Sequence, residues 1–223
     1  MALTLYMTPG SCSTGIHILL ERLALPFAAH VLNLPAGQHR GPAYLAINPK
    51  GSIPTLVLDD GRALCEFEAI ALWLARRHPQ AGLLPQDPVD EAQAIGLMAD
   101  VVGHLHGQAF TRVFTPERYL PPAMADALAA AGLHAAWREA VVAQGREMAA
   151  AAFERIAARL PPGIEHEGFA FGPHWGVADA ALFYPEFWAE KTGLPLPARC
   201  AAHLQRMRAQ PVVRQVLAEE GYR

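Results

Sequence analysis

Apolar and polar residues alternate along Leu3–Tyr6, as they do in a half-buried β-strand. Further along, apolar residues recur every three or four positions, which is typical of an amphipathic helix: Ile16, Leu19, Leu20 and Leu23. The change of period falls within Thr8–Ser13, a segment that contains Pro9 and Gly10 and so favours a turn. The sequence therefore predicts a strand, a tight turn and a helix, with Cys12 where the helix begins.

The chain up to about residue 80 continues to mix strand and helix patterns. We expect a strand over Phe27–Leu32 and a short helix or turn over Gly41–Ile47. Within Thr55–Cys65, two strand-like runs flank Asp60-Gly61, a strong signal for the tight turn of a β-hairpin. A helix follows, with an apolar face that includes Ile70, Trp73 and Leu74. The predicted order is βαβ, a connector and ββα.

Almost every pattern after residue 90 is helical, and this change marks a domain boundary. Asp90 is the expected N-cap of a helix with one apolar stripe: Ile95, Met98, Val102 and Leu105. Further helices are expected over Met124–Ala131, Ala135–Leu160, Val177–Glu190, Ala198–Arg208 and Pro211–Glu220. We therefore divide the chain into an α/β domain (1–80), an irregular linker (81–89) and an all-helical domain (90–223).

The composition narrows the classes of function. The net charge is −3 and no basic stripe is present, so small molecules or proteins are expected partners, and nucleic acid and membranes are not. No apolar run is long enough to span a bilayer, and the N-terminus lacks a secretory signal pattern. Three cysteines without a close pair predict neither a disulfide framework nor a thiolate metal site. We expect a cytoplasmic protein without a metal.

Cys12 is the first candidate for chemistry. Unpaired backbone N–H groups and the positive end of the helix dipole would favour its thiolate, or an anionic sulfur ligand beside it. We therefore expect Cys12 to be the most reactive of the three thiols. It alone lies at a predicted strand-to-helix turn, whereas Cys65 lies at a predicted strand end and Cys200 in a late helix. The alternative is a small, half-buried cysteine without chemistry.

Five short motifs, in their order and spacing, resemble those of the cytosolic glutathione transferases, and of the bacterial beta class most closely. They are Thr8–Ser13, Asn48–Pro54, Leu58–Gly61, Glu66 before a helix, and Gly176–Asp179, so the resemblance spans nearly the whole chain. It implies a thioredoxin-like domain that binds glutathione as cosubstrate. It also implies an all-helical domain that forms one wall of the site for a hydrophobic electrophile. It further implies that the protein is a homodimer.

The resemblance assigns residues to the glutathione site. Ile53-Pro54 is similar to the family's cis-proline turn, in which the residue before proline offers its backbone to the cysteinyl part of glutathione. Glu66 occupies the position at which members of the family contact the γ-glutamyl end of glutathione. Phe67 replaces the family's usual serine; its backbone N–H can still cap a carboxylate, and Phe67→Ser is expected to tighten binding. The other residues implied to bind glutathione are Ser13, Leu34 and Ser52.

The resemblance also assigns residues to the electrophile site. His106 matches a beta-class histidine that points at the active cysteine, although Gly107 stands where relatives often carry lysine. Trp188 matches a tryptophan that closes the electrophile pocket, and a buried core tryptophan is the competing interpretation. Tyr6 is a lesser candidate for this site, and it joins Ser11 and Ser13 as a candidate donor to sulfur.

Two other features are interpreted as structural. Asp179 lies three residues after Gly176, the expected N-cap, and can accept hydrogen bonds from the first N–H groups of a helix. His104 and His106 are two positions apart and do not share a helix face, so we expect no metal site there.

Two mechanisms stay open for the transferase that these residues predict. In conjugation, the site lowers the pKa of the glutathione thiol, whose thiolate attacks an electrophile held near His106 and Trp188. In thiol–disulfide chemistry, Cys12 itself attacks and forms a mixed disulfide with glutathione. The rival function is that of a non-catalytic binding or regulatory protein with the same fold. The presence of Cys12, Ile53-Pro54 and Glu66 favours the enzyme.

Overall fold

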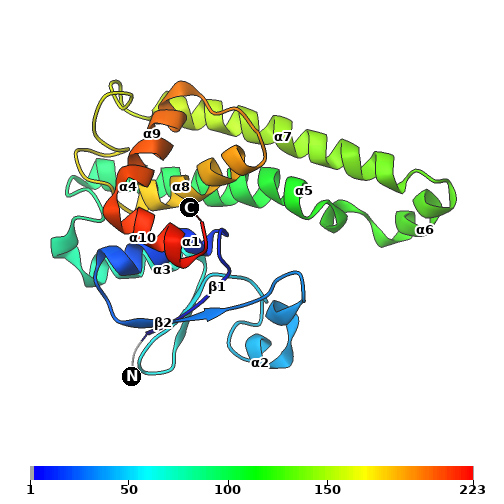
Figure 1. Ribbon diagram of the computed structural model, residues 1–223, viewed down its shortest axis with the longest axis horizontal. Helices are drawn as coiled ribbons and strands as arrows, with labels where there is room; N and C mark the ends of the chain where they lie inside the picture. Colours follow the sequence, from blue (N-terminus) through cyan, green and yellow to red (C-terminus); the bar gives the residue numbers. More distant parts are fainter. Residues whose placement is uncertain (1–2, 223) are drawn as a thin grey trace.

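The computed structural model describes residues 3–222, and Figure 1 shows its arrangement. Its first part contains a four-stranded sheet in the order β2-β1-β3-β4. The strands are β1 (Leu3–Met7), β2 (Phe27–Val31), β3 (Thr55–Val57) and β4 (Ala63–Cys65). β1 pairs parallel with β2 and antiparallel with β3, and β3 pairs antiparallel with β4. Helix α1 (Ser13–Arg22) follows β1 and helix α3 (Phe67–Arg77) follows β4, which is the predicted βαβ–ββα order.

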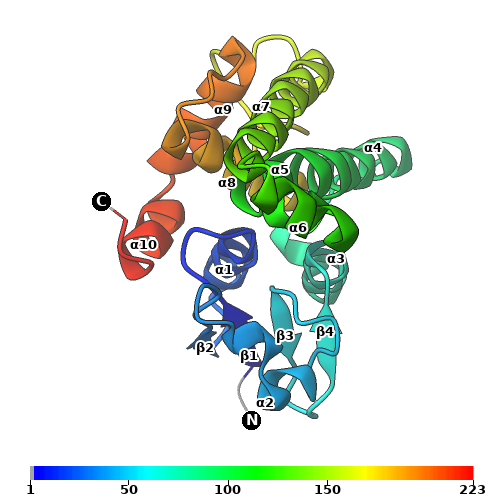
Figure 2. The ribbon, with the colours of Figure 1, turned by 90° about the vertical axis from the view of Figure 1, so that its right-hand side faces the viewer.

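Different elements lie against the two faces of the sheet. Helices α1 and α3 lie on one face, while η1 (Gln38–Arg40) and α2 (Pro42–Leu45) lie in the connector between β2 and β3 (Figure 2). Successive side chains of a strand point to opposite faces. Leu5 and Met7 of β1 are buried in the core beneath α1, whereas Tyr6 contacts Tyr44 of α2 with their ring centroids 5.4 Å apart.

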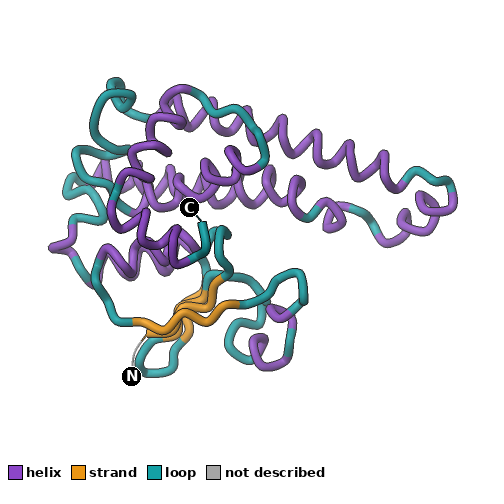
Figure 3. The backbone as a smooth tube through the Cα atoms, in the orientation of Figure 1, coloured by secondary structure: helices purple, strands orange, loops and turns teal. Residues whose placement is uncertain are grey.

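The rest of the chain is helical, as the sequence predicts (Figure 3). Its elements are η2 (Pro79–Ala81), α4 (Pro88–Asp100), η3 (Val101–Phe110), α5 (Thr111–Phe114), η4 (Pro116–Tyr119), α6 (Pro122–Ala130), α7 (His134–Arg159), α8 (Val177–Lys191), α9 (Ala198–Ala209) and α10 (Pro211–Glu219). Helix α8 is buried along nearly its whole length and contacts both α1 and α3, so it joins the sheet-bearing part to the helical part. No helix within residues 3–222 is both long and apolar enough to cross a membrane.

The helix after the linker begins earlier than predicted. Asp87, not Asp90, is the N-cap of α4, and its Oδ1 accepts hydrogen bonds from the N–H groups of Val89 at 2.9 Å and Asp90 at 3.0 Å. Pro88 occupies the first helical position, where a missing N–H loses no intrahelical bond. The non-helical crossing therefore covers 82–87 rather than 81–89. The division into domains stays a prediction.

The apolar stripe of this helix also differs from the prediction. Ile95 and Val102 are only half-buried, whereas Val101 is fully buried. The buried face is set within α4, where Ala94, Leu97 and Met98 are buried, and Val101 continues it three residues after Met98. The segment that follows, η3, is π-helical, so its hydrogen bonds join residues five apart. Buried positions there recur at Val101, Leu105 and the pair Ala109-Phe110, a wider spacing than the 3.6-residue period assumed from the sequence.

Asp179 has the structural role expected of it. Its carboxylate accepts hydrogen bonds from the N–H groups of Gly176 at 2.7 Å and Ala170 at 2.8 Å, and it lies 3.1 Å from His203 Nε2. Glycine is required at the cap because a Cβ on Gly176 would overlap the carbonyl oxygen of Leu83. The absence of a side chain at Gly176 therefore allows α8 to approach Leu83.

Candidate active site

Cys12 is the N-cap residue of α1 and follows the turn after β1, as predicted. Its side chain is only 6% exposed, and Sγ donates a hydrogen bond to the carbonyl oxygen of Ile53 at 3.4 Å. The contact crosses from the start of α1 to the segment that precedes β3. The structure therefore brings together two of the predicted site residues, one from each of two separate motifs.

The expectation of an acidic Cys12 thiol is wrong for the protein without a ligand. Burial raises the pKa of Cys12 to about 12, and the charge of Glu66 adds to this effect. The backbone N–H groups of Cys12 and Ser13 act in the opposite direction, as a helix start should, but burial outweighs them. The sequence predicts the helix start correctly, but no local pattern reports how completely the rest of the chain covers Cys12.

Ser13 lies inside the turn rather than facing a ligand. It is fully buried, and its Oγ donates to the carbonyl oxygen of Thr8 at 3.2 Å and accepts from the Thr8 N–H at 3.1 Å. Ser11 Oγ lies 2.6 Å from the same atom. These contacts occupy the Ser13 hydroxyl and help to shape the turn, and the part of Ser13 in the glutathione site stays a prediction.

The Ile53-Pro54 peptide bond is cis, which confirms the expected turn. Hydrogen bonds to the preceding residue hold this turn in place. The Ser52 carbonyl oxygen accepts from Asn48 Nδ2 at 2.9 Å and from the Tyr44 hydroxyl at 2.5 Å. Within residues 3–222, the Ile53 N–H makes no hydrogen bond to the protein. The turn therefore offers a free backbone donor beside the carbonyl that Cys12 contacts.

Glu66 directly precedes α3 in a conformation that non-glycine residues rarely adopt, with φ 76° and ψ 133°. Such backbone is costly and concentrates at functional sites. Its side chain is 46% exposed and pairs with Lys50, whose Nζ lies 2.8 Å from Glu66 Oε1. The strained backbone therefore presents an accessible carboxylate at the start of α3.

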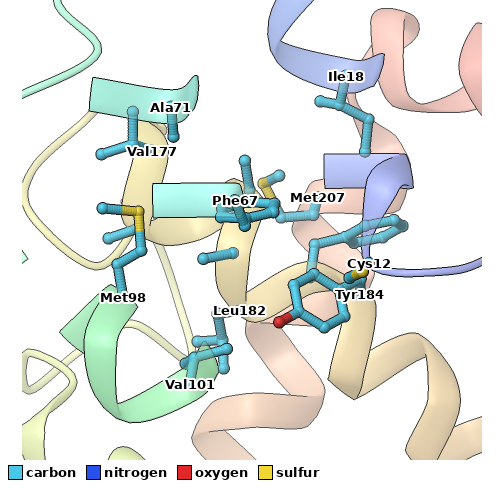
Figure 4. Packing of buried hydrophobic residues seen from close by; sticks show 14 of the residues in the cluster. Cys12, Ile18, Phe67, Ala71, Met98, Val101, Val177, Leu182, Tyr184 and Met207 are labelled. Carbon is cyan, nitrogen blue, oxygen red and sulfur yellow. The ribbon is translucent and has the colours of Figure 1, made fainter. Parts of the chain in front are cut away.

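Phe67 is a core residue as well as the first residue of α3. Its side chain is 2% exposed, and its ring lies 5.6 Å from the ring of Tyr184 in α8. It belongs to the same buried cluster as Cys12 and Tyr184 (Figure 4). Only its backbone is left for a ligand, because the N–H at the first helical position has no acceptor within the helix.

His106 and Trp188 meet across η3 and α8. Their rings are nearly perpendicular, with centroids 5.0 Å apart, and His106 Nδ1 lies 3.3 Å from the Tyr184 hydroxyl. Burial lowers the pKa of His106 to about 4, and the charge of Arg118 acts in the same direction. At neutral pH this wall therefore carries no imidazolium.

Trp188 is buried, with 8% of its surface exposed, in agreement with the competing interpretation. Its ring packs against those of Phe110 and Phe114, and its Nε1 donates to the carbonyl oxygen of Gly10 at 2.7 Å. Gly10 lies in the turn that carries Cys12. Trp188 thus anchors that turn to the helical part of the chain.

Tyr6 does not reach this site. Its ring contacts His30 and Tyr44, with centroids 4.7 and 5.4 Å away, on the side of β1 opposite to the buried Leu5 and Met7. The alternation of the strand that predicts β1 also places Tyr6 away from Cys12. Leu34 is half-buried in the loop after β2, and its part in the site stays a prediction.

Within residues 3–222, one set of side chains places possible metal ligands within 4.8 Å of one another: His17, Glu21 and Glu219. His17 Nε2 lies 3.2 Å from Glu219 Oε2, so a histidine–carboxylate pair accounts for this proximity. The set lines a cavity of about 350 Å³ between α1, β2 and the chain end. His104 is elsewhere, exposed and paired with Asp100 at 2.9 Å.

Comparisons with known proteins agree with this geometry. A sequence profile described as glutathione S-transferase, N-terminal domain, matches residues 10–77. Glutathione S-transferase GstA of Escherichia coli O157:H7 is 30% identical to the chain, over 97% of this chain and 98% of that protein. The chain belongs to the glutathione S-transferase family. The predicted fold and family are confirmed.

Solved structures extend the comparison. A glutathione transferase homologue from Sulfitobacter, solved with bound glutathione, is similar with a TM-score of 0.84 and 28% identity over 98% of both chains. The bacterial beta class glutathione S-transferase of Sphingomonas chungbukensis is similar with a TM-score of 0.76 and 26% identity, also over 98% of both. The fold class predicted for this transferase therefore holds over nearly all of the described residues.

Tyr184 is the residue of this transferase's candidate site that the sequence reasoning missed. It is 1% exposed, and burial, together with the nearby groups Cys12 and Glu68, raises its pKa well above the usual value. It lies four residues before Trp188 on α8, and residues four apart share a helix face. The spacing of four residues between Tyr184 and Trp188 could have indicated from the sequence that Tyr184 belongs to the site.

Proposed function

We propose that the turn carrying Cys12 is the glutathione site of this transferase and that the enzyme conjugates glutathione to a hydrophobic electrophile. The observation that carries the proposal is the 3.4 Å contact between Cys12 Sγ and the Ile53 carbonyl oxygen. An extended peptide can pair with the free backbone of Ile53 as an added strand would. The cysteinyl sulfur of a peptide bound there would lie beside Cys12.

The start of α3 suits the γ-glutamyl end of glutathione. The ligand's ammonium group would contact the exposed Glu66 carboxylate in place of Lys50. The ligand's α-carboxylate would accept hydrogen bonds from the N–H groups of Phe67 and Glu68, because a helix N-terminus favours an anion. Burial, with the charge of Glu66, raises the pKa of the neighbouring Glu68.

The protonation state of Cys12 favours conjugation over disulfide chemistry. With a pKa of about 12, Cys12 is a thiol at neutral pH, so it would turn its S–H from the Ile53 carbonyl oxygen to the sulfur of glutathione rather than attack. Glutathione releases its thiol proton to solvent, and its sulfur then attacks the electrophilic carbon. A sulfur–carbon bond forms while the displaced electron pair departs with the leaving group. The disulfide route would require the thiolate of Cys12.

The aromatic cluster formed by His106, Tyr184, Trp188 and Phe114 would form the wall beside the electrophile. Phe114 is 47% exposed, so part of this cluster is open to solvent. Because His106 is neutral at pH 7, the wall would favour planar apolar molecules over anions. A hydrophobic electrophile is therefore the substrate class that this surface fits.

We further propose that the enzyme is a cytoplasmic homodimer. Its three cysteines are free, which fits a reducing compartment. Several large apolar side chains are exposed and could be covered by a second copy of the chain: Val31, Val89, Phe114, Met124 and Leu133. Sedimentation at micromolar concentration tests this state, and a mass near 24.1 kDa would contradict it.

Calorimetry with glutathione tests the binding proposal. The wild-type protein should bind, and Glu66→Gln should weaken binding about tenfold, since a hydrogen bond between charged groups is lost. Asp60→Asn is the matched control, because Asp60 is another exposed carboxylate of the first part of the chain and pairs only with its neighbour Arg62. The absence of a heat of binding at millimolar glutathione would contradict the proposed site. An equal loss of glutathione affinity in Glu66→Gln and Asp60→Asn would also contradict it.

A further inference from the structure

Three side chains that can ligate a metal ion converge where helices α1 and α10 meet. His17 and Glu21 are four residues apart and share a face of α1, and Glu219 is the last residue of α10, which lies beside α1 (Figures 1 and 2). One ligand atom of each residue lies within 4.8 Å of the other two. His17 is buried, Glu21 half-buried and Glu219 exposed, so the set can be reached from solvent.

The distances within this set fit a tetrahedral zinc ion. Zinc binds imidazole nitrogen and carboxylate oxygen at about 2.0–2.2 Å, which places neighbouring ligand atoms about 3.3 Å apart. His17 Nε2 and Glu219 Oε2 are 3.2 Å apart. The carboxylate of Glu21 lies within 4.8 Å of both, so a rotation of its half-buried side chain completes the set. Water can take the fourth position from the exposed side.

The charges around His17 favour a cation. Its Nδ1 lies 2.9 Å from Glu220 Oε1, so three carboxylates surround one imidazole. Within residues 3–222, none of the three pairs with lysine or arginine. A neutral imidazole that donates from Nδ1 to Glu220 has a lone pair on Nε2. Because that nitrogen lies 3.2 Å from Glu219 Oε2, a proton or a metal ion must lie between the two atoms. A metal ion can thus replace the proton of this histidine–carboxylate pair.

Each of the three ligands is held by a residue outside the set. Gln215 Nε2 donates hydrogen bonds to Glu21 Oε2 at 3.1 Å and to Glu219 Oε1 at 2.9 Å, so one amide orients both carboxylates. Glu220 lies behind His17 at Nδ1 and leaves Nε2 for the ion. Metal ligands in proteins are usually oriented in this way, with a carboxylate behind the histidine and hydrogen bonds to the ligating carboxylates. Such support is not expected of acidic side chains that are merely close together.

We propose that His17, Glu21 and Glu219 bind one divalent metal ion of the zinc type. Imidazole together with carboxylates suits zinc, whereas calcium and magnesium take oxygen ligands. The ion joins α1 to α10 and stabilises the folded protein, because the unfolded chain lacks the assembled set. The sequence does not predict this site, since Glu219 lies at the opposite end of the chain from His17 and Glu21.

Calorimetric titration of the chelator-treated protein with zinc chloride, without glutathione, tests the site. The wild type should bind one ion per chain. Gln215→Leu should weaken binding about tenfold, because loss of a residue that orients ligands costs about 10–100-fold. Glu219→Gln removes a ligand itself and should weaken binding about a hundredfold or more. Glu139→Gln is the matched control, because Glu139 is an exposed carboxylate of α7 that does not line this cavity, and its affinity should equal that of the wild type.

Thermal unfolding shows whether the variants fold and supplies a second measurement. The side chain of Glu219 is 44% exposed, so Glu219→Gln without metal should unfold at nearly the same temperature as the wild type. Zinc at a hundredfold excess over the wild-type dissociation constant should raise the wild-type midpoint by about 5–10 °C. At the same concentration, the midpoint of Glu219→Gln should rise by about 1 °C.

Anomalous diffraction at the zinc absorption edge locates the ion, which should lie between His17, Glu21 and Glu219. An ion bound at Cys65 or elsewhere, no binding at millimolar zinc chloride, or equal weakening in Glu219→Gln and Glu139→Gln would overturn the proposal. The titration contains no glutathione, so failure of glutathione binding would refute the proposed function and leave the metal site untouched.

Discussion

The ring of Phe67 occupies the space that a side chain at Gly15 would need. A Cβ on Gly15 would come within 2.7 Å of Phe67 Cε2 and 2.6 Å of the Ala180 carbonyl oxygen. The aromatic ring at the start of α3 and the missing side chain in α1 therefore fit one another, and α8 closes the contact. In a position where the family usually carries serine, this chain has a residue that joins three helices.

This contact changes the expected result of Phe67→Ser. The serine hydroxyl would add one donor for a ligand carboxylate, but the substitution also removes a buried aromatic ring. We expect the free energy of unfolding to fall by about 3 kcal/mol or more. Chemical denaturation measures this loss, and calorimetry on the folded fraction measures any gain in glutathione affinity.

Phe67→Leu is the control, because it keeps an apolar side chain and should cost about 1.5 kcal/mol at most. Equal stability of the wild type and Phe67→Ser would show that the ring does not support the interface between the three helices.

The order of elements could be predicted because each has a local signal. The hairpin turn at Asp60-Gly61 and the helix start at Cys12 are predicted from neighbouring residues alone. The surroundings of Cys12 could not be predicted in this way. Cys12 packs near Tyr184, which lies far away in the sequence, and no local pattern reports that contact.

The π-helical segment shows a second limit of the sequence pattern. The predicted stripe places Val102 on the buried face, whereas the structure buries Val101, the first residue of this segment, in line with Ala94, Leu97 and Met98 of α4. His106 lies in the same segment, and its Nδ1 lies 3.3 Å from the Tyr184 hydroxyl of α8. The residue assigned by resemblance is in place, but its neutral state comes from packing that the motif does not encode.

Alkylation of the wild-type protein without glutathione should modify Cys65 before Cys12. With a pKa of about 12, only roughly one Cys12 in 10⁵ is a thiolate at pH 7, whereas Cys65 is half-buried and more accessible. Limiting iodoacetamide followed by peptide mapping gives the order. Cys65→Ser should leave the slow rate at Cys12 unchanged, and modification of Cys12 ahead of Cys65 would contradict the burial argument.

Substitution of Cys12 separates the two mechanisms. In conjugation the nucleophile is glutathione, so Cys12→Ser should keep part of the conjugating activity because the serine hydroxyl can still donate to sulfur. Any glutathione-dependent reduction of disulfides through Cys12 should be abolished. Both activities are measured on one preparation, and complete loss of conjugation with glutathione binding intact would argue for covalent chemistry at Cys12.

His106 should not impose a titration on catalysis near neutral pH. Its pKa is lowered to about 4, so it stays neutral from about pH 5.5 to 8. The pH profile of kcat/KM over this range should have the same shape in the wild type and in His106→Gln, with a reduction of about tenfold or less in the variant. A wild-type inflection near pH 6 that the variant lacks would show that His106 acts as a proton donor or cation.

His203 makes stability fall as pH rises. It is fully buried, with Nδ1 2.7 Å from Glu186 Oε2 and Nε2 3.1 Å from Asp179 Oδ1. Burial alone would lower the pKa of His203, but Glu186 and Asp179 outweigh it and raise the pKa from 6.5 to about 10. The folded protein therefore keeps a proton that the unfolded chain loses above about pH 6.5.

The stabilisation from this proton is fully present below about pH 6.5 and is lost as pH rises through about 10. Urea denaturation at several pH values should show a decrease of up to about 1.4 kcal/mol per pH unit in this window. His203→Gln cannot take up the proton, so it should be less stable at pH 6 and nearly level over the same range. If the wild type and the variant lose stability equally between pH 7 and 10, His203 is not the group responsible.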